Sequence, residues 1–489
     1  MKVRTRYAPS PTGNMHIGNL RTALYGYLYA RKTGGDFVVR IEDTDQARFQ
    51  ENATEIIFRT LEQTGLDYDE GPGKEGACGP YYQSERREIY KEYAQKLIDK
   101  GAAYYCFCTD EQLEADRKAA EEKGEVYKYP KTCLRLSKDE IQKRLDAGEP
   151  YVIRQNTPTS GTVSFDDVIF GTISVDCADL DDMILLKSDG LPTYNFANVV
   201  DDHLMGITHV MRGSEYLSST PKYNLLYQAF GWETPVYVHL PLIMKDATHK
   251  LSKRNGDMSF EDLIAIGFLP EAVVNYIALL GWNDGTNQEI YTRQELIDAF
   301  DLTGISKSPS IFDLPKIRWM NGEYIKALPF ETFLPLALPW IEKSPELSKY
   351  DAGKLAKLIQ SRIEILSEIP EKLAFLPNVA PHTPELYCHK KFKLDARSAR
   401  ESLEQVRALY ETLPIWDETS IHDGLIELAQ KTGKKNGMIM WPARVALCGL
   451  ESTPGGAVEL ADILGRDETL RRIEQAIALL QDAHKGDEG

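Results

Sequence analysis

Residues 8–19 of the chain, APSPTGNMHIGN, place proline, serine, glycine and histidine directly before a helical pattern. Backbone N–H groups at the start of a helix form an anion-binding site. Gly18 lets a nucleotide approach the backbone closely, and His16 can donate a hydrogen bond to a phosphate. The segment therefore suits phosphate binding, although a plain turn with a helix cap and an ordinary surface histidine would give the same pattern.

A second group of chemically suitable residues is the basic run at positions 250–254, KLSKR, which Asn255 and Gly256 follow. Three cations within five residues suit a triphosphate or the charge of its transition state. A solvated basic loop is the alternative interpretation.

Three cysteines, Cys106, Cys108 and Cys133, form a third group. Thiolates with C-x-C spacing can hold a tetrahedral metal ion, and three free, partly buried thiols are the alternative. The remaining cysteines are scattered along the chain, and we expect them to be packing residues: Cys78, Cys177, Cys388 and Cys448.

Composition limits the class of protein that can carry these groups. Of the 489 residues, 42% are hydrophobic and 27% are charged, which excludes a disordered or fibrous chain. The formal net charge of −17 argues at first against a general nucleic-acid binder. The acidity is uneven, however, because residues 151–325 hold 12 basic and 23 acidic side chains while residues 1–60 hold 9 and 6. A nucleic-acid partner would therefore need a defined basic face.

The predicted compartment is the cytoplasm. Seven cysteines are too few for a disulfide framework and fit a reducing environment. The N-terminus has no apolar stretch behind its charges, so no secretory signal is expected. The most apolar stretch, residues 263–282, contains Pro270, Glu271 and Asn275 and therefore predicts a buried helix pair instead of a membrane span.

Helices and strands must position the three groups. Residues 37–41 predict a short strand that ends in acidic residues, and residues 19–31 predict a helix. Further predicted elements of the first half are strands at 151–154 and 184–187 and a charged helix at 110–124. After about residue 325 helical periodicity dominates, with helices expected at 352–366, 398–413, 421–432 and 468–483. The sequence thus predicts an α/β half followed by an all-α half.

Together, the first two motifs resemble the HIGH and KMSKS signatures of class I aminoacyl-tRNA synthetases. The strings RYAPSPTG at 6–13, RIEDTD at 40–45, PTYNFANVVDDH at 192–203 and WMNG at 319–322 resemble one family of that class, the bacterial-type glutamyl-tRNA synthetases, over essentially the whole chain. Asn19 and Arg254 depart from the literal signatures, and both replacements are common in this family.

The resemblance implies a fold and a domain organisation. The expected fold is a Rossmann-like class I catalytic region at 1–325, a doubly wound parallel sheet with its ligand at the switch point. An acceptor-stem-binding insertion is expected at about 85–192, and a connecting region that contacts the tRNA stem at about 245–325. An all-helical anticodon-binding domain is expected at 326–489.

The resemblance also implies ATP-dependent ligation of L-glutamate to tRNA(Glu) through a glutamyl-adenylate, with Mg²⁺ arriving as a companion of ATP. The implied catalytic residues are His16, Asn19, Lys250 and Lys253. The implied ATP-binding residues are Pro9, Ser10, Gly13, His16, Gly18, Asn19, Glu215, Lys250, Ser252, Lys253 and Arg254.

The side chain of a glutamate substrate needs a buried, fork-shaped cation, which favours arginine over lysine. The resemblance places Arg6 and Arg212 there, within a glutamate-binding set of Arg6, Ser10, Glu42, Tyr194, Asn198 and Arg212. Arg48, Arg362 and Arg444 are the implied tRNA-binding residues, with Lys434 and Lys435 as further candidates. The C-x-C…Y-x₃-C pattern resembles a zinc site found in part of this family, which adds Tyr129 to Cys106, Cys108 and Cys133.

Four alternative functions would require a different sequence. A glutaminyl-tRNA synthetase would have a tRNA-reading half of β-barrel character, and the shortened paralogue that modifies a tRNA base would lack the helical half. An inactive tRNA-binding protein would not need the two motifs, and a generic nucleotidylyltransferase would not need the helical tail.

We expect a monomer without a membrane partner, and whether tRNA(Gln) is also charged stays open.

Overall fold

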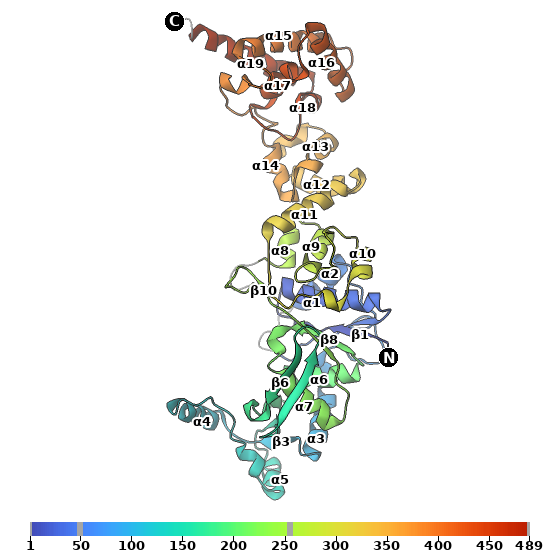
Figure 1. Cartoon of the computed structure of the whole chain (residues 1–489), viewed down its shortest axis with the longest axis vertical. Coiled ribbons are helices and arrows are strands. Elements are labelled where there is room, and N and C mark those ends of the chain that lie inside the picture. Colours follow the sequence, from blue (N-terminus) through green and yellow to red (C-terminus); the bar gives the residue numbers. More distant parts are fainter. Residues whose placement is uncertain (1, 46–51, 252–257, 487–489) are drawn as a thin grey trace. The chain divides into compact units, whose positions relative to one another are not determined.

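The computed structural model describes residues 2–45, 52–251 and 258–486, with side-chain surroundings given up to residue 481 (Figure 1). The chain divides into two compact units. The first comprises Met1–Ile264 and Pro270–Leu314, and the second comprises Ala265–Leu269 and Pro315–Gly489.

Parallel β-α-β units form the centre of the first unit. Strand β1 (Arg4–Tyr7) pairs in parallel with β2 (Asp36–Val39), and helix α1 (Ile17–Lys32) connects them. Strand β8 (His209–Gly213) pairs in parallel with β9 (Val236–Leu240) across helix α7 (Thr220–Phe230), while α6 (Tyr194–Leu204) precedes β8. The main chain joins the two pairs, because the Thr208 N–H donates to the Arg4 carbonyl at 2.9 Å. Loops at the carboxyl ends of such strands form ligand sites.

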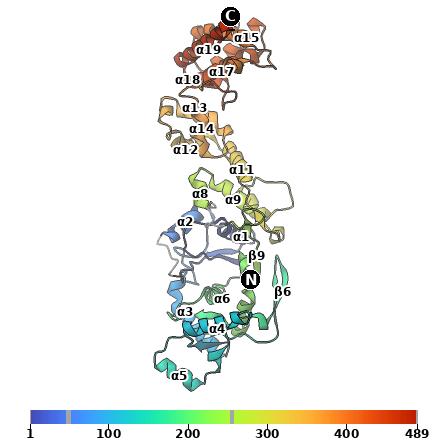
Figure 2. The same ribbon diagram turned by 90° about the vertical axis from the view of Figure 1, so that its left-hand side faces the viewer.

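Helix α1 is buried on nearly every side because other elements cover it (Figure 2). It packs on β1, β2 and β8 and also contacts α9 (Pro270–Ala278) and α10 (Arg293–Ala299). The Tyr25 ring lies 5.1 Å from that of Phe300, and its hydroxyl donates to the carbonyls of Ala278 and Leu280. The apolar stretch at 263–282 is thus the end of α8 (Phe260–Ala265) followed by α9. None of the described helices is both long and apolar enough to cross a membrane.

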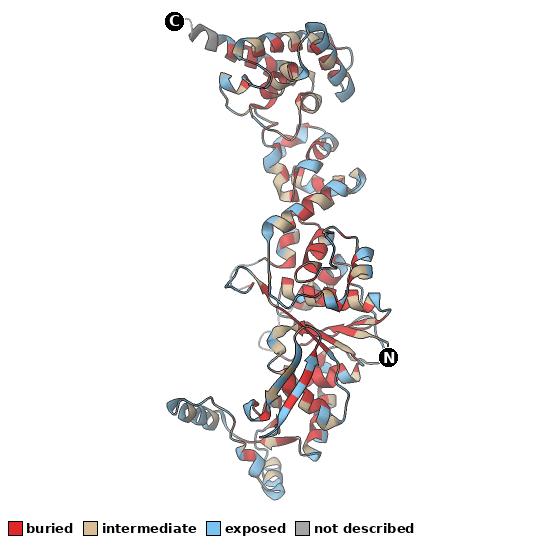
Figure 3. Cartoon of the chain, in the orientation of Figure 1, coloured by how far each residue is buried: buried red, intermediate tan, exposed pale blue. Residues whose placement is uncertain are grey.

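An inserted segment follows the second strand. Strands β3 (Ala103–Cys106), β4 (Val152–Gln155) and β7 (Ile184–Leu186) form an antiparallel sheet. The hairpin of β5 (Thr162–Asp167) and β6 (Gly171–Asp176) joins the other sheet, because Asp167 pairs with Tyr237 of β9. Helices α4 (Asp110–Glu122) and α5 (Lys138–Asp146) have no buried residue and lie at the surface (Figure 3). The other helices here are α2 (Ala53–Gln63), η1 (Gln83–Arg86), α3 (Arg87–Asp99), η2 (Thr132–Arg135) and η3 (Cys177–Asp179).

A short parallel pair closes the first unit, β10 (Ile243–Met244) with β11 (Ser310–Ile311). The 3₁₀ turns η4 (Ser214–Tyr216) and η6 (Leu302–Gly304) follow β8 and α10.

The second unit is helical, and its described residues contain no strand. Its longest helices, α15 (Ala396–Thr412) and α19 (Arg466–Gly486), pack on each other and on α17 (Asn436–Cys448). Arg472 is buried among them and donates to the Leu447 and Leu376 carbonyls, both at 2.5 Å. The remaining helices are α11 (Leu314–Ala327), α12 (Phe330–Ile341), η7 (Pro345–Lys349), α13 (Ala352–Ile359), η8 (Gln360–Arg362), η9 (Leu366–Glu368), α14 (Ile369–Leu373), η10 (Pro384–Tyr387), α16 (Glu418–Thr432) and α18 (Ala457–Leu464).

Candidate active site

The loop after β1 carries the first motif, and His16 caps helix α1. The Nδ1 atom of His16 accepts the Gly18 N–H at 3.0 Å, so the ring hydrogen resides on Nε2. That Nε2 lies 3.1 Å from the Leu251 carbonyl, to which it donates. One neutral imidazole therefore joins the first motif to the start of the second.

Met15 makes the second connection between the motifs. Its carbonyl accepts the Phe260 N–H at 3.1 Å, and its N–H donates to a carboxylate oxygen of Glu261 at 2.9 Å. The other oxygen of Glu261 accepts the Thr60 hydroxyl at 2.7 Å. Sequence reasoning missed Glu261, since an acid in the first turn of a helix is usually only a favourable end charge.

Both motifs line one cavity of about 700 Å³. The expected ATP-binding residues that line it are Pro9, Ser10, Gly13, His16, Asn19 and Lys250. Gly18 and Glu215 do not, because Gly18 is in the first turn of α1 and Glu215 is exposed on η4. Ser252, Lys253 and Arg254 lie outside the described residues.

Lys250 occupies one arm of a tight turn. The Lys245 N–H donates to the His249 carbonyl at 2.8 Å, and the Leu251 N–H donates to the Ile243 carbonyl at 3.1 Å. Leu251 is buried and Lys250 is exposed, as alternation along an extended segment requires. The turn thus presents the Lys250 ammonium at the cavity that His16 lines.

A buried charge network lies beneath the strand ends. Arg6 donates through Nε to both carboxylate oxygens of Asp202, at 3.1 and 3.3 Å, and through Nη1 to the Met211 carbonyl at 3.0 Å. Arg40, which is fully buried, donates to Asp202 at 2.9 Å and to Glu42 at 3.1 Å. The N–H of Glu42 donates to the Pro9 carbonyl at 3.0 Å, so the network adjoins the first motif.

Aromatic rings surround the second expected arginine of the glutamate site. The guanidinium of Arg212 lies 5.4 Å from the ring centre of Tyr216, 4.9 Å from that of Tyr223 and 5.4 Å from that of Tyr237. Such rings stabilise a buried cation through their π faces. The Tyr194 ring packs against that of Tyr216 at 5.0 Å, so Tyr194 belongs to the same cluster of aromatic rings.

Tyr194 is close enough to Glu42, Arg212 and Arg6 for their charges to affect its ionisation. Burial raises the pKa of Tyr194 well above its ordinary value, with Glu42 adding to the shift and Arg212 and Arg6 opposing it. The phenol is therefore a neutral donor. Asn198, one turn further along α6, donates to the Tyr194 carbonyl at 2.7 Å and so holds the start of that helix.

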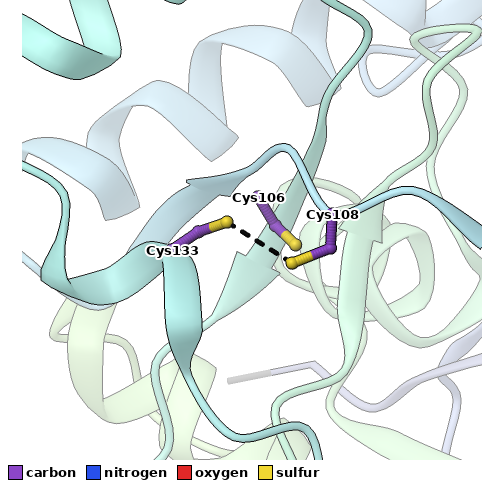
Figure 4. A group of neighbouring side chains, drawn as sticks. All are labelled: Cys106, Cys108 and Cys133. Carbon is purple, nitrogen blue, oxygen red and sulfur yellow. Dashed lines mark hydrogen bonds between the residues drawn. The ribbon is translucent and has the colours of Figure 1, made fainter. Parts of the chain in front are cut away.

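Three sulfur atoms converge in the inserted segment (Figure 4). The Sγ atoms of Cys106, Cys108 and Cys133 all lie within 4.8 Å of one another, and those of Cys108 and Cys133 are 3.6 Å apart. The Tyr129 hydroxyl is 3.3 Å from both Cys106 Sγ and Cys108 Sγ. The Phe107 N–H donates to Cys133 Sγ at 3.3 Å, although the contact with Cys106 and burial raise the pKa of Cys133. The four expected ligands are thus neighbours.

The expected tRNA-binding arginines differ in their surroundings. Arg362 is exposed at the end of η8 and lines a cavity of about 680 Å³. Arg444 lines another of about 790 Å³, stacks at 4.7 Å on Trp441 and donates to the Leu450 and Glu451 carbonyls. Arg48 lies outside the described residues.

Lys434 has an internal role in the second unit. Its ammonium donates to the Ser402 hydroxyl at 3.0 Å and to the Gln405 amide oxygen at 3.1 Å, and burial lowers its pKa. An ammonium that is partly buried and bonded within the protein ties α15 to the loop before α17.

Comparison with known proteins defines the class first. The model of the class I tRNA synthetase catalytic domain (E and Q) matches residues 2–319, and the model of an anticodon-binding domain matches residues 332–477. A class I catalytic domain followed by a helical anticodon-binding domain is therefore present, which confirms the expected fold class.

The relatives define the family within that class. Glutamate–tRNA ligase of Clostridium kluyveri is 57% identical over 481 residues, covering 98% of both chains, and that of Clostridium botulinum strain Hall is 56% identical over 480 residues, covering 98% of this chain and 99% of the relative. The crystal structure of a glutamate tRNA ligase from Elizabethkingia meningosepticum in complex with its amino acid is 35% identical, with a TM-score of 0.87 and coverage of 98% of this chain and 100% of the other. The chain belongs to the glutamate–tRNA ligases, and the expected activity is confirmed.

Proposed function

We propose that this chain joins L-glutamate to tRNA(Glu) in two transfers at the cavity and the buried pocket beside it. In the first, an α-carboxylate oxygen of glutamate bonds to the α-phosphorus of ATP while the bond to pyrophosphate breaks. In the second, the 2′-hydroxyl of the terminal adenosine of the tRNA bonds to the carbonyl carbon of the glutamyl-adenylate, and AMP leaves. Both transfers depend on positioned reactants and stabilised charge more than on covalent help from the protein.

The observation that supports this proposal most is the single cavity that both motifs line, with His16 bonded to Leu251 across it. In this proposal the loop amides, His16 and Asn19 bind the phosphates on one side, and Lys250 and Lys253 neutralise the developing charge on the other. Mg²⁺ arrives with ATP. Because the charge is greatest in the transition state, the two lysines accelerate adenylate formation more than they tighten ATP binding.

The neighbouring pocket has the chemistry to select glutamate. In this proposal Arg6 and Arg212 supply fork-shaped donors for the side-chain carboxylate and the Tyr194 hydroxyl supplies another, while Ser10 and Glu42 hold the α-ammonium. Glutamine would leave a buried guanidinium facing an amide with no charge, and this mismatch opposes its binding.

The cysteine cluster fits a structural zinc ion. A tetrahedral ion with Zn–S bonds of about 2.3 Å keeps its sulfurs about 3.8 Å apart, and Cys108 and Cys133 are 3.6 Å apart. The Tyr129 hydroxyl is the proposed fourth ligand, and it lies 3.3 Å from two of the sulfurs. When bound, zinc would cross-link the end of β3 to η2. Such a cross-link stabilises a segment that has few buried residues of its own.

The tRNA contacts, the compartment and the oligomeric state remain predictions. We assign Arg48, Arg362 and Arg444 to tRNA, with Arg362 facing the third anticodon base, and we expect a cytoplasmic monomer. The exposure of Arg362 supports the proposal that it contacts tRNA. Arg444 already binds main-chain carbonyls, so its part includes shaping the loop at residues 450–453.

Aminoacylation with radiolabelled glutamate against purified tRNA(Glu) and tRNA(Gln) tests the proposal. Charging of tRNA(Glu) with glutamate and not with glutamine is expected, and failure to charge tRNA(Glu) would refute it. The same assay on tRNA(Gln) separates a strict enzyme from a relaxed one. Pyrophosphate exchange with and without tRNA then tests whether activation requires tRNA, as the family resemblance implies.

A further inference from the structure

Behind Arg212 lies a buried chain of polar contacts that the reaction described above does not use. The Arg212 Nε donates to the Nε2 of His239 at 3.0 Å, and the Nδ1 of His239 lies 2.7 Å from a carboxylate oxygen of Asp167. His239 is fully buried, and Asp167 is 4% exposed. The three residues come from β8, β9 and β5, so separate strands must align before the chain can form.

Asp167 is held as an acceptor by four donors. The N–H groups of Ile169 and Phe170 reach one oxygen at 2.9 Å each, and the N–H and Nδ1 of His239 reach the other at 3.1 and 2.7 Å. Burial opposes its ionisation, but the bonds from His239 and from the main chain lower the pKa of Asp167. An ionised carboxylate cannot donate, so the hydrogen between these residues belongs to Nδ1 of His239.

This arrangement selects one state of His239. With the hydrogen on Nδ1, Nε2 has a free lone pair, and this lone pair faces the Nε–H of Arg212. Burial and the charge of Arg212 lower the pKa of His239, against the pull of Asp167. A second proton on the ring would place the Nε2–H of His239 against the Nε–H of Arg212.

The chain constrains the plane of the Arg212 guanidinium. Nε is bonded to His239, and Nη2 donates to the Thr220 hydroxyl at 2.8 Å. Among the residues that the structure describes, Nη1 makes no hydrogen bond. The rings of Tyr216, Tyr223 and Tyr237 surround the same group. Two of the three guanidinium nitrogens are therefore fixed by the protein, and the third is left for a carboxylate.

We propose that His239, oriented by Asp167, is a positioning residue that aims Arg212 at the side-chain carboxylate of the substrate. The inference rests on the proposed role of Arg212 in glutamate binding. It assigns selectivity for an anionic side chain partly to a residue that does not touch the substrate. It also makes the inserted hairpin, which supplies Asp167, a part of the amino-acid pocket.

A histidine that only fills the core would also be buried and bonded, so the test must separate positioning from stability. In His239→Phe an aromatic ring is kept and the acceptor for Arg212 is lost. In His239→Gln an amide restores an acceptor toward Arg212 and a donor toward Asp167. His203→Phe is the matched control, because His203 is exposed and stacks on Trp232 at 3.7 Å, away from Arg212.

Steady-state aminoacylation of tRNA(Glu), with the intact chain and thermal melting of each variant, gives the readout. Loss of an acceptor bonded to a charged group is expected to raise the KM for glutamate about 10- to 100-fold in His239→Phe. The KM for ATP should change less than about twofold, because ATP occupies the other cavity. His239→Gln should recover most of the loss, and His203→Phe should behave as the parent chain.

Each result separates a positioning role of His239 from a purely structural one. An unchanged KM for glutamate in folded His239→Phe would overturn the inference, as would a parallel rise of the KM values for glutamate and ATP, or equal damage in the Gln and Phe variants. If His239→Phe does not fold, Asp167→Asn decides, because it removes the carboxylate that orients His239: a rise in the KM for glutamate alone supports positioning, and an unchanged KM for glutamate or a parallel rise in both KM values overturns it. A parent chain that does not charge tRNA(Glu) would instead refute the proposed function itself.

Discussion

Glu42 gives the proposed glutamate site a pH dependence whose size can be worked out. Its side chain is buried, 5% exposed, and lies beside the first motif because its N–H is bonded to the Pro9 carbonyl. Burial raises the pKa of Glu42 to about 7, although Arg40 and Arg6 act in the opposite direction. Holding the α-ammonium of the substrate requires the ionised carboxylate. Glutamate should therefore bind better as the pH rises through about 7.

The magnitude follows from the titration. A carboxyl group with a pKa of about 7 is ionised in roughly 9% of molecules at pH 6 and roughly 91% at pH 8. If only the ionised form binds, the KM for glutamate falls about tenfold over this interval.

The same group makes the folded chain less stable as the pH rises. The folded chain keeps the proton up to about pH 7 while the unfolded chain loses it near pH 4.5, so up to about 3 kcal/mol of this group's contribution to the free energy of unfolding is lost between those values.

Aminoacylation at saturating ATP and tRNA, from pH 6 to pH 8, measures the effect, with the KM for ATP recorded at each pH as a reference. Glu42→Gln is the control, because an amide resembles the protonated acid and does not titrate. The KM for glutamate of Glu42→Gln should be high and should not change with pH, so the ratio of its KM to that of the parent chain should grow about tenfold from pH 6 to pH 8. A KM for glutamate that is flat in the parent, or that falls equally in Glu42→Gln, would refute the reasoning.

Four further outcomes are expected. Lys253→Ala should slow ATP–pyrophosphate exchange at least about 100-fold while tRNA binding in a filter assay survives, because charge on the leaving phosphates loses its partner; a nearly unchanged exchange rate would reject the role. Glu261→Gln cannot accept from both Met15 and Thr60 and should raise the KM for ATP about tenfold, with the KM for glutamate unchanged; an unaltered KM for ATP would contradict the coupling. Purified without chelator, the chain should contain one zinc ion by mass spectrometry, and Cys133→Ser should lose it and melt several degrees lower; a metal-free parent excludes the site. Arg362→Ala should lower the preference for tRNA(Glu) over tRNA(Gln) about tenfold in kcat/KM; an unchanged ratio would remove the assignment.

Local patterns predicted the elements that carry their own signals. Strand β2 lies in the run of β-branched and aromatic residues that predicted a strand, and helix α1 lies in the run rich in Leu, Ala and Tyr that predicted a helix. The long helices α15, α16 and α19 match their apolar spacing. The helix expected at 352–366 stops at Ile359 as an α-helix and continues only as the short turn η8. Helix α17 was not predicted, because Pro442 lies inside it and interrupts the helical signal.

The contacts between side chains could not be predicted from the sequence, because they join residues that are far apart along the chain. Arg40 and Asp202 are 162 residues apart, and each looks like an ordinary charge beside other charges until the strands bring them together. Lys434 shows the same dependence on the fold, since the basic loop predicts a nucleic-acid contact and only the structure shows that the ammonium also donates to Ser402 and Gln405. Residue type predicted which groups suit phosphate and carboxylate, but only the fold determines which donors remain available.

The segments that carry the two signature motifs are connected by one side-chain and one main-chain hydrogen bond, and this affects how substitutions should be interpreted. Leu251 and Phe260 lie on either side of residues 252–257, and both are bonded to the first motif, through His16 and Met15. A ligand that displaces the loop of the first motif must therefore either break these hydrogen bonds or move Leu251 and Phe260 together with that loop. In the proposed site the one N–H of His16 can donate either to the Leu251 carbonyl or to a phosphate, so His16→Ala removes both possibilities and its kinetic cost overstates direct contact with ATP. Glu261→Gln weakens a tie without removing a group that lines the cavity, so the difference between the two variants separates phosphate binding from the alignment of the motifs.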